Sequence, residues 1–213
     1  ETAVVSLQNG VDAPDQLAAT LGANHVVVGI SMIRCFIAGP GHLHNTQSPY
    51  PNLQLGEMDH RSSDRVERLR RLSEQSGLTA IIPDDIHAAL WGKFLMFSVA
   101  SGMGAITRTT TGVWRSLPET RQISEDAVRE VVALAIAAGI SLPDEPVKST
   151  MDLFDRMSEG HSTSMAKDLM EGRPSELEAA IGLVVRLGND LGVDTPVNRL
   201  LWNSLLLQEL EAR

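Results

Sequence analysis

Residues 86–107, IHAALWGKFLMFSVASGMGAIT, decide the fold, because this stretch predicts a long helix that is apolar on nearly every face. Its one charged residue is Lys93. A helix of this kind belongs inside a hydrophobic core, where an ammonium group is costly to desolvate. A buried lysine needs a partner, a lowered pKa or a polar cleft beside it, and general acids and Schiff-base lysines arise in this way. The alternative is a lysine whose stem follows the helix while its head reaches water.

The composition excludes several classes of function. The chain has 213 residues, 43% of them hydrophobic, which is enough for a sizeable core in one or two domains. A net charge of −9 without a long basic run argues against a nucleic-acid partner. The lone cysteine, Cys35, excludes an internal disulfide and fits a reducing, cytosolic setting. No export leader opens the chain, and the lysine and glycines within 86–107 favour a core helix over a membrane span, so we expect a cytoplasmic protein with no membrane partner.

The part of the chain before residue 85 alternates between strand and helix patterns. Strands are predicted at 3–7, 26–33, 53–55 and 79–82, and helices at 14–21 and 63–75. The Gly39-Pro40-Gly41 turn indicates some antiparallel pairing. This alternation predicts an α/β layer. Because four short strands rarely form a complete α/β sheet, and no G-x-G-x-x-G turn is present, residues 1–84 are interpreted as the second half of a nucleotide-binding fold.

From residue 85 onward the sequence predicts only helices, so 85–213 is interpreted as an all-α domain. After the lysine helix, they are expected at about 116–139, 146–158, 164–171, 175–191 and 196 to the end. The first of these has capping-box spacing at Ser116 with a proline in its first turn. The residues expected on inward helix faces are Ile123, Ala127, Val131, Ile136, Leu177, Ile181, Val184, Leu191, Leu200, Leu201 and Leu205.

Three polar positions can be set beside Lys93. Asn9 directly follows the first strand, where the carboxyl edge of a sheet presents side chains to a ligand, although Asn-Gly is also a common turn pair. Ser164 opens a short polar helix, where it is either a ligand contact or an N-cap. Glu176 lies in the first turn of its helix and, unlike Glu178, lines up with the apolar edge. We expect no metal site at His42-x-His44, since no carboxylate or cysteine lies at ligand spacing, and no nucleophile at Cys35.

The order of these residues resembles the ketopantoate reductase (2-dehydropantoate 2-reductase) family over essentially the whole chain. The parts that match are Gln8-Asn9-Gly10 after a strand, the turn Pro40-Gly41-His42, and Leu90–Lys93 at a helix start. Further along, Ser164-Met165 is followed by Asp168, and Glu176 lies twelve residues after the serine.

The resemblance implies an NADPH-dependent reductase of 2-oxo acids in pantothenate biosynthesis, with a Rossmann-type NADP-binding domain and a helical substrate-binding and dimerisation domain. In such enzymes the lysine matching Lys93 is the catalytic acid, and the glutamate matching Glu176 contacts cofactor and substrate. The asparagine matching Asn9 contacts the cofactor, a main-chain cofactor contact falls near Cys35, and the serine matching Ser164 holds the substrate.

The departures from the family pattern concern the substrate. Ketopantoate-reducing members carry asparagines at four places where this chain has Phe97, Ser101, Thr111 and His161. Replacing amides by phenyl and hydroxyl groups changes which polar groups of a substrate can find hydrogen-bond partners in the site. A different, more apolar oxo acid is therefore as plausible a substrate as ketopantoate.

Two other hypotheses remain open. Lys93 could form a Schiff base, as in aldolases, which borohydride trapping would detect. The chain could instead be a non-catalytic dimerisation or binding module, or a degenerate reductase homologue. The reductase hypothesis predicts that Asn9, Lys93, Ser164 and Glu176 converge on one groove with Phe97 and Ser101 lining it.

Overall fold

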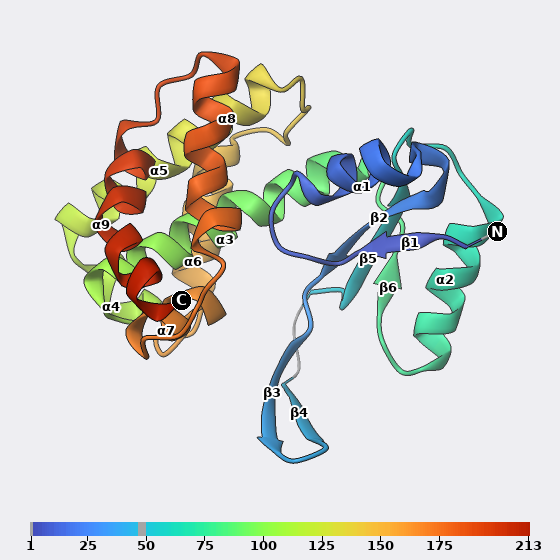
Figure 1. Cartoon of the computed structure of the whole chain (residues 1–213), viewed down its shortest axis with the longest axis horizontal. Coiled ribbons are helices and arrows are strands. Elements are labelled where there is room, and N and C mark those ends of the chain that lie inside the picture. Colours follow the sequence, from blue (N-terminus) through green and yellow to red (C-terminus); the bar gives the residue numbers. More distant parts are fainter. Residues whose placement is uncertain (1, 47–49) are drawn as a thin grey trace. The chain divides into compact units, whose positions relative to one another are not determined.

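The computed structural model describes residues 2–46 and 50–213 and divides into two compact units, Glu1–Leu90 and Trp91–Arg213. The first is an α/β unit and the second is helical (Figure 1). The expected fold class, a partial Rossmann-like α/β domain followed by an all-α domain, is confirmed. The contacts of the chain divide a few residues after the position near 85 that the sequence indicates, inside the lysine helix.

A four-stranded sheet forms the centre of the α/β unit. Its strands lie in the order β1 (Val4–Ser6), β2 (Val26–Ser31), β5 (Leu53–Glu57) and β6 (Ala80–Ile81). β1 runs parallel to β2, β2 antiparallel to β5, and β5 parallel to β6. A separate hairpin joins β3 (Arg34–Gly39) to β4 (His42–Thr46), which confirms antiparallel pairing around the Gly39–Gly41 turn.

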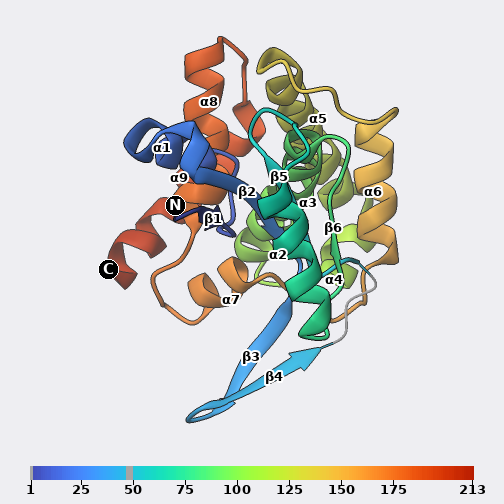
Figure 2. The ribbon, with the colours of Figure 1, turned by 90° about the vertical axis from the view of Figure 1, so that its right-hand side faces the viewer.

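Apolar side chains on both faces of β2 hold this sheet to its helices. Val26, Val27, Val28 and Ile30 are at most 1% exposed, as expected for a strand covered on both sides. Helix α2 (Asp64–Gln75) covers one face, where Val66 packs with Val27 and Leu55, and Figure 2 shows it lying across β5 and β6. The remaining helical segments of the unit are α1 (Ala13–Leu21) and the short 3-10 turn η1 (Ala23–His25).

Gly56 lets the lysine helix approach the sheet. A Cβ on Gly56 would lie 2.7 Å from Cβ of Ile86, the first residue of that helix. His87 adds a hydrogen bond of 2.9 Å between its Nε2 and the carbonyl of Met58, and Asp85 accepts from the backbone N–H of Ala88 at 2.8 Å. The start of the helix is thus fixed to the end of β5.

The described residues of the second unit are all helical or connecting segments, as the sequence predicts. The elements are α3 (Ile86–Thr107), α4 (Thr111–Ser116), α5 (Pro118–Ala137), α6 (Pro146–Arg156), α7 (Ser164–Met170), the π-helical turn η2 (Glu178–Gly182), α8 (Leu183–Leu191) and α9 (Pro196–Ala212). Figure 1 shows α5, α8 and α9 side by side. Helix α3 has the length and apolar composition of a membrane span, but it is mostly buried within the protein and is a core helix.

The capping box predicted at Ser116 is wrong. Helix α5 begins at Pro118 with Leu117 as its N-cap, and the Ser116 hydroxyl donates to the carbonyl of Val113 instead. The reason is α4, a helix that the sequence does not predict, which ends at Ser116 and uses the serine at its C-terminus.

Several residues expected to face inward are exposed, namely Ile123, Ile136, Leu191 and Leu200. The buried residues of α5 include Ala127, Val128, Val131, Leu134 and Ala135, and Ile136 lies nine residues after Ala127, half a turn around the helix. Leu200 is 64% exposed because its neighbour Leu201 faces the core, and adjacent helical residues point about 100° apart.

Candidate active site

Lys93 lies about two turns inside α3 in an apolar environment. Phe94 and Leu95, the next two residues, are at most 2% exposed, and Trp91 stacks edge-on against Phe94 with ring centroids 5.8 Å apart. The Lys93 side chain is half-buried. Burial lowers the pKa of Lys93 below the usual lysine range, and the negative charge of Glu176 raises it part of the way back. A lysine in this state gives up a proton more readily than a lysine in water.

Glu176, whose charge acts on Lys93, lies in the segment between α7 and α8. It immediately precedes a single helical residue and the π-helical turn η2, and its carbonyl accepts the first helical hydrogen bond, from Ala180 N at 2.9 Å. Turns of this type occur frequently at functional sites. Helix α3 touches the turn closely, since a Cβ on Gly102 would lie 2.8 Å from Cδ1 of Ile181. The lysine helix and the turn after Glu176 are therefore packed against one another.

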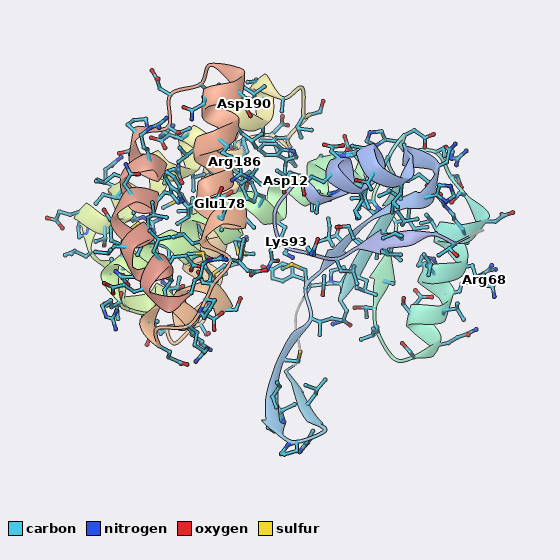
Figure 3. The ribbon with its side chains drawn as sticks, in the orientation of Figure 1. Asp12, Arg68, Lys93, Glu178, Arg186 and Asp190 are labelled. Carbon is cyan, nitrogen blue, oxygen red and sulfur yellow. The ribbon has the colours of Figure 1, made fainter. Side chains whose placement is uncertain are left out.

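Glu178, the second glutamate near the start of this helix, pairs with an arginine. Its side chain is about half exposed and forms an ion pair with Arg186, about two helical turns farther along. Figure 3 shows Glu178 and Arg186 on the same helical segment, whereas Lys93 comes from α3. The Glu178 carboxyl also lies directly over Gly182. Of the two glutamates, Glu176 is the one whose charge raises the pKa of Lys93. Glu176 precedes Leu177, the first helical residue, so the expected place of Glu176 in the first turn of the helix is wrong.

Ser164 is the first residue of α7 and is exposed, but it is not the N-cap. Thr163 has that role, and its hydroxyl accepts from Ala166 N at 3.2 Å. The capping alternative considered for Ser164 is therefore excluded. Helix α7 lies close to α3, because a Cβ on Gly104 would lie 3.2 Å from Cβ of Ala166.

Thr111 and His161 lie together although fifty residues separate them in sequence. The backbone N–H of Thr111 donates to the carbonyl of His161 at 2.8 Å, and Gly112 N donates to the carbonyl of Glu159 at 3.0 Å. Thr111 is 2% exposed and His161 is half-buried. The structure thus joins two of the four positions at which the chain departs from the family pattern.

Phe97 and Ser101 follow Lys93 on α3 and are buried, at 7% and 0% exposure. The Ser101 hydroxyl has no hydrogen-bond partner among the described residues, whereas Ser98 donates to the carbonyl of Phe94. A buried hydroxyl without a partner is uncommon and destabilising. That the two residues line a groove stays a prediction.

Asn9 and Cys35 belong to the α/β unit. Asn9 lies three residues beyond the end of β1, half-buried, and is followed by Gly10 with φ +99°. The segment therefore leaves the carboxyl end of a parallel strand, the edge at which α/β sheets bind ligands. Cys35 lies in β3 and is exposed. Their contacts with a cofactor, and the convergence of Asn9 with the helical residues, stay predictions.

Sequence reasoning missed two features of the site. The first is the π-helical turn after Glu176, for which helical periodicity gives no signal. The second is Glu209, a buried carboxylate on α9 that binds Ser175, the residue before Glu176. The sequence did contain a signal for Glu209. It lies on the same helical face as Leu201 and Leu205, where a charged residue is unexpected.

Comparison with known proteins identifies the family. The model described as "Ketopantoate reductase PanE/ApbA C terminal" matches residues 85–209, and the model "Ketopantoate reductase PanE/ApbA" matches residues 1–60. The chain belongs to the ketopantoate reductase family. The first of these matches covers more than half of the chain and includes Lys93, Ser164 and Glu176.

The curated relatives of this ketopantoate reductase family member include 2-dehydropantoate 2-reductases. The protein from Nostoc sp. is 26% identical over 207 residues, which cover 95% of the chain and 64% of the relative. The protein from Archaeoglobus fulgidus is 26% identical over 200 residues, 94% of the chain and 66% of the relative. The chain thus spans about two thirds of the length of these relatives.

Solved structures show the same fold. A ketopantoate reductase from Ralstonia eutropha superimposes with a TM-score of 0.87 at 28% identity, covering 99% of the chain and 67% of that protein. A D-mandelate dehydrogenase in complex with NADH also has a TM-score of 0.87, at 22% identity, covering 100% of the chain and 71% of that protein. The second likeness establishes the fold alone.

Proposed function

We propose that the protein reduces a 2-oxo acid to the hydroxy acid with NADPH, and that Lys93 supplies the proton. The observation that carries the proposal is the state of Lys93, a half-buried lysine of lowered pKa acted on by Glu176. Perturbed titratable groups of this kind cluster at functional sites. Membership in the ketopantoate reductase family and the 2-dehydropantoate 2-reductase relatives support the reaction class.

The residues present fit a nicotinamide cofactor at the edge where β1 ends. Asn9 and the positive-φ Gly10 follow a parallel strand at its carboxyl end, which is where nucleotide-binding sheets hold their ligands. Asn9 would contact the cofactor there, with the backbone near Cys35 as a further contact. The cofactor, when bound, supplies the hydride for the substrate carbonyl carbon.

In this proposal Lys93 acts on the carbonyl oxygen of the substrate, and Glu176 acts on Lys93. The Lys93 ammonium donates its proton to the oxygen as negative charge develops there, and its lowered pKa brings its acidity closer to what proton transfer near neutral pH requires. Glu176 keeps the ammonium protonated until the substrate arrives, because its charge raises the pKa of Lys93. The half-buried setting strengthens both effects, since less water screens the charges.

Ser164 would hold the carboxylate of the substrate. Thr111 and His161, which the hydrogen bond between their backbones joins, would hold the rest of it. Buried Phe97 replaces an amide of the ketopantoate-reducing pattern one turn after Lys93. This apolar ring supports an oxo acid with a larger apolar group as an alternative to ketopantoate, because a site rejects polar groups that it cannot satisfy.

The experiment is an assay of NADPH oxidation by the full-length protein against a panel of 2-oxo acids, including ketopantoate and aryl or branched oxo acids. Lys93→Ala should lower kcat/KM at least about a hundredfold, the usual contribution of a positioned acid. Lys148→Ala is the matched control, because Lys148 is an exposed lysine of the same unit that pairs with Asp152 on the surface. Undiminished turnover in Lys93→Ala would refute the role of Lys93.

Two further properties belong to this proposal. We expect a homodimer, supported by the fold neighbour from Staphylococcus aureus described as a dimeric ketopantoate reductase, and light scattering over a concentration series measures it. We also expect a cytoplasmic protein. Among the described residues, α3 is the one helix that is long and apolar enough to cross a membrane, and its burial within the protein is in keeping with this expectation. Cell fractionation of the native protein tests that location.

A further inference from the structure

Glu209 is a carboxylate buried in the helical unit at 4% exposure, on the last helix, α9. Removing a carboxylate from water is strongly unfavourable unless it is hydrogen-bonded. An apolar residue of similar volume would satisfy the packing of α9 at least as well. The position of the carboxylate is therefore explained by its partners rather than by packing.

The principal partner of Glu209 is Ser175. The backbone N–H of Ser175 donates to Oε2 at 3.0 Å and to Oε1 at 3.2 Å, and its hydroxyl donates to Oε2 at 2.5 Å. Arg213 Nε donates to Oε1 at 2.8 Å, so the charge is compensated at the end of the same helix. Charge-assisted hydrogen bonds of this kind are stronger than neutral ones and fix geometry.

Ser175 transmits this attachment to both sides of Glu176. Its hydroxyl oxygen, besides donating to Glu209, accepts from the backbone N–H of Leu177 at 3.1 Å. The carbonyl of Glu176 itself is held by Ala180 N at 2.9 Å. The backbone around Glu176 is thus held at Ser175, at Leu177 and at the carbonyl of Glu176. Glu209 makes the first of these attachments directly and orients the Ser175 hydroxyl that makes the second.

We propose that Glu209 is a positioning residue, which acts through Ser175 to hold the Glu176 carboxylate at the distance from Lys93 that the reductase site requires. The proposal rests on the proposed function of Lys93 and Glu176. Within the helical unit the charged group acting on Lys93 is Glu176, and its effect depends on the separation of the two charges. A displacement of about 1 Å at such a site is enough to reduce turnover strongly.

The test compares Glu209→Gln with Glu130→Gln in the full-length protein. Glutamine keeps the volume of Glu209 but puts an amide N–H₂ in place of one carboxylate oxygen. Both oxygens of Glu209 accept hydrogen bonds, so the N–H₂ faces an N–H or O–H donor. Glu130 is the matched control, a carboxylate of α5 that accepts from Val197 N, Asn198 N and Asn198 Nδ2 at the opposite end of α9. Both variants remove a carboxylate that anchors α9, but only the first touches the segment before Glu176.

The readout is the pKa of Lys93, measured by NMR titration of protein with ¹³C-labelled lysine and assigned through loss of the signal in Lys93→Arg. In Glu209→Gln the pKa of Lys93 should fall by about half a unit or more, toward its value in Glu176→Gln, because the charge that raises it moves away. In Glu130→Gln it should stay at the wild-type value. In parallel, kcat in Glu209→Gln should fall roughly ten- to a hundredfold, with a smaller change in KM.

An unchanged pKa of Lys93 in folded Glu209→Gln, or an equal shift in both variants, would overturn the proposal. If Glu209→Gln does not fold, Ser175→Ala takes its place, because it removes the hydroxyl link to Leu177 but keeps the backbone contact with Glu209. It should lower the pKa of Lys93 by a smaller amount, and no change would again overturn the proposal. Full activity in Lys93→Ala would refute the proposed function instead, while the pKa comparison does not depend on turnover.

Discussion

Glu57 illustrates, at the residue scale, how this chain places charge inside a unit. Its side chain is 3% exposed at the end of β5 and accepts from Arg65 Nε at 2.6 Å, Arg65 Nη2 at 2.5 Å and the Ser63 hydroxyl at 2.6 Å. Arg65 also donates to the carbonyl of Asn24 at 2.5 Å. The hydrogen bonds from Arg65 are the largest cause of a pKa of Glu57 below the usual glutamate range.

This pair predicts a pH-dependent contribution to stability. Glu57→Gln should lower the free energy of unfolding at pH 7 by about 1.5–3 kcal/mol, the range for hydrogen bonds to charged groups. Because the pKa of Glu57 is lowered on folding, its contribution is complete above the titration range of an unfolded glutamate, at about pH 4.3. It is lost as the pH falls through the lowered pKa of the folded state.

Urea unfolding of the full-length protein at pH 7 and at pH 2–3 measures this effect. The difference between wild type and Glu57→Gln should shrink at the lower pH. Glu74→Gln is the control, since exposed Glu74 pairs with Arg70 on helix α2, and ion pairs of exposed groups contribute little. A constant difference between wild type and Glu57→Gln at both values would contradict the assignment.

At the scale of elements, glycines set the distances between helices and loops in the helical unit. Gly112, in α4, lies against the backbone of the segment 159–161, and a Cβ there would be 2.6 Å from Cα and 2.7 Å from the carbonyl oxygen of Glu159. Backbone atoms cannot move aside as a side-chain tip can. By contrast, the contact that a Cβ on Gly102 would meet is the end of the flexible Ile181 side chain.

Gly112→Ala should therefore destabilise the protein by about 1–3 kcal/mol, the usual effect of overpacking. It should also weaken the hydrogen bond from Thr111 N to the carbonyl of His161, which hydrogen exchange of the Thr111 amide reports. Gly160→Ala is the matched control in the same segment, because a Cβ there would meet nothing within 4 Å. Equal stability of the two variants would show that the 159–161 segment can shift.

At the scale of the whole molecule, the chain is shorter than the relatives it matches. It spans 64% of the Nostoc relative, and among the described residues β1 pairs with one strand, β2. We expect the 213-residue chain by itself to show neither NADPH binding nor turnover, because the phosphate-binding turn of such folds lies on the first βα unit. Fluorescence titration with NADPH of the chain and of the full-length protein measures the difference, and equal affinities would contradict the expectation.

The sequence by itself determined the class of fold and the family. Alternating strand and helix patterns before residue 85 and helical periodicity after it predicted an α/β part and a helical part, because these periods depend on local backbone geometry. The isolated charge in 86–107 made Lys93 a candidate functional residue, since a lone ammonium group on an apolar helix is energetically exceptional. The sequence also favoured Glu176 over Glu178, and the charge of Glu176 raises the pKa of Lys93, while the catalytic roles of both residues stay predictions.

The tertiary structure alone decided how these residues are held. Which of Leu200 and Leu201 faces the core depends on where the neighbouring helices lie, and the π-helical turn after Glu176 departs from the helical period. The contacts of Thr111 with His161 and of Ser175 with Glu209 join residues fifty and thirty-four positions apart, and no local pattern encodes such pairs. They form because a buried polar group must find a partner, and only the packed chain determines which partner lies within reach.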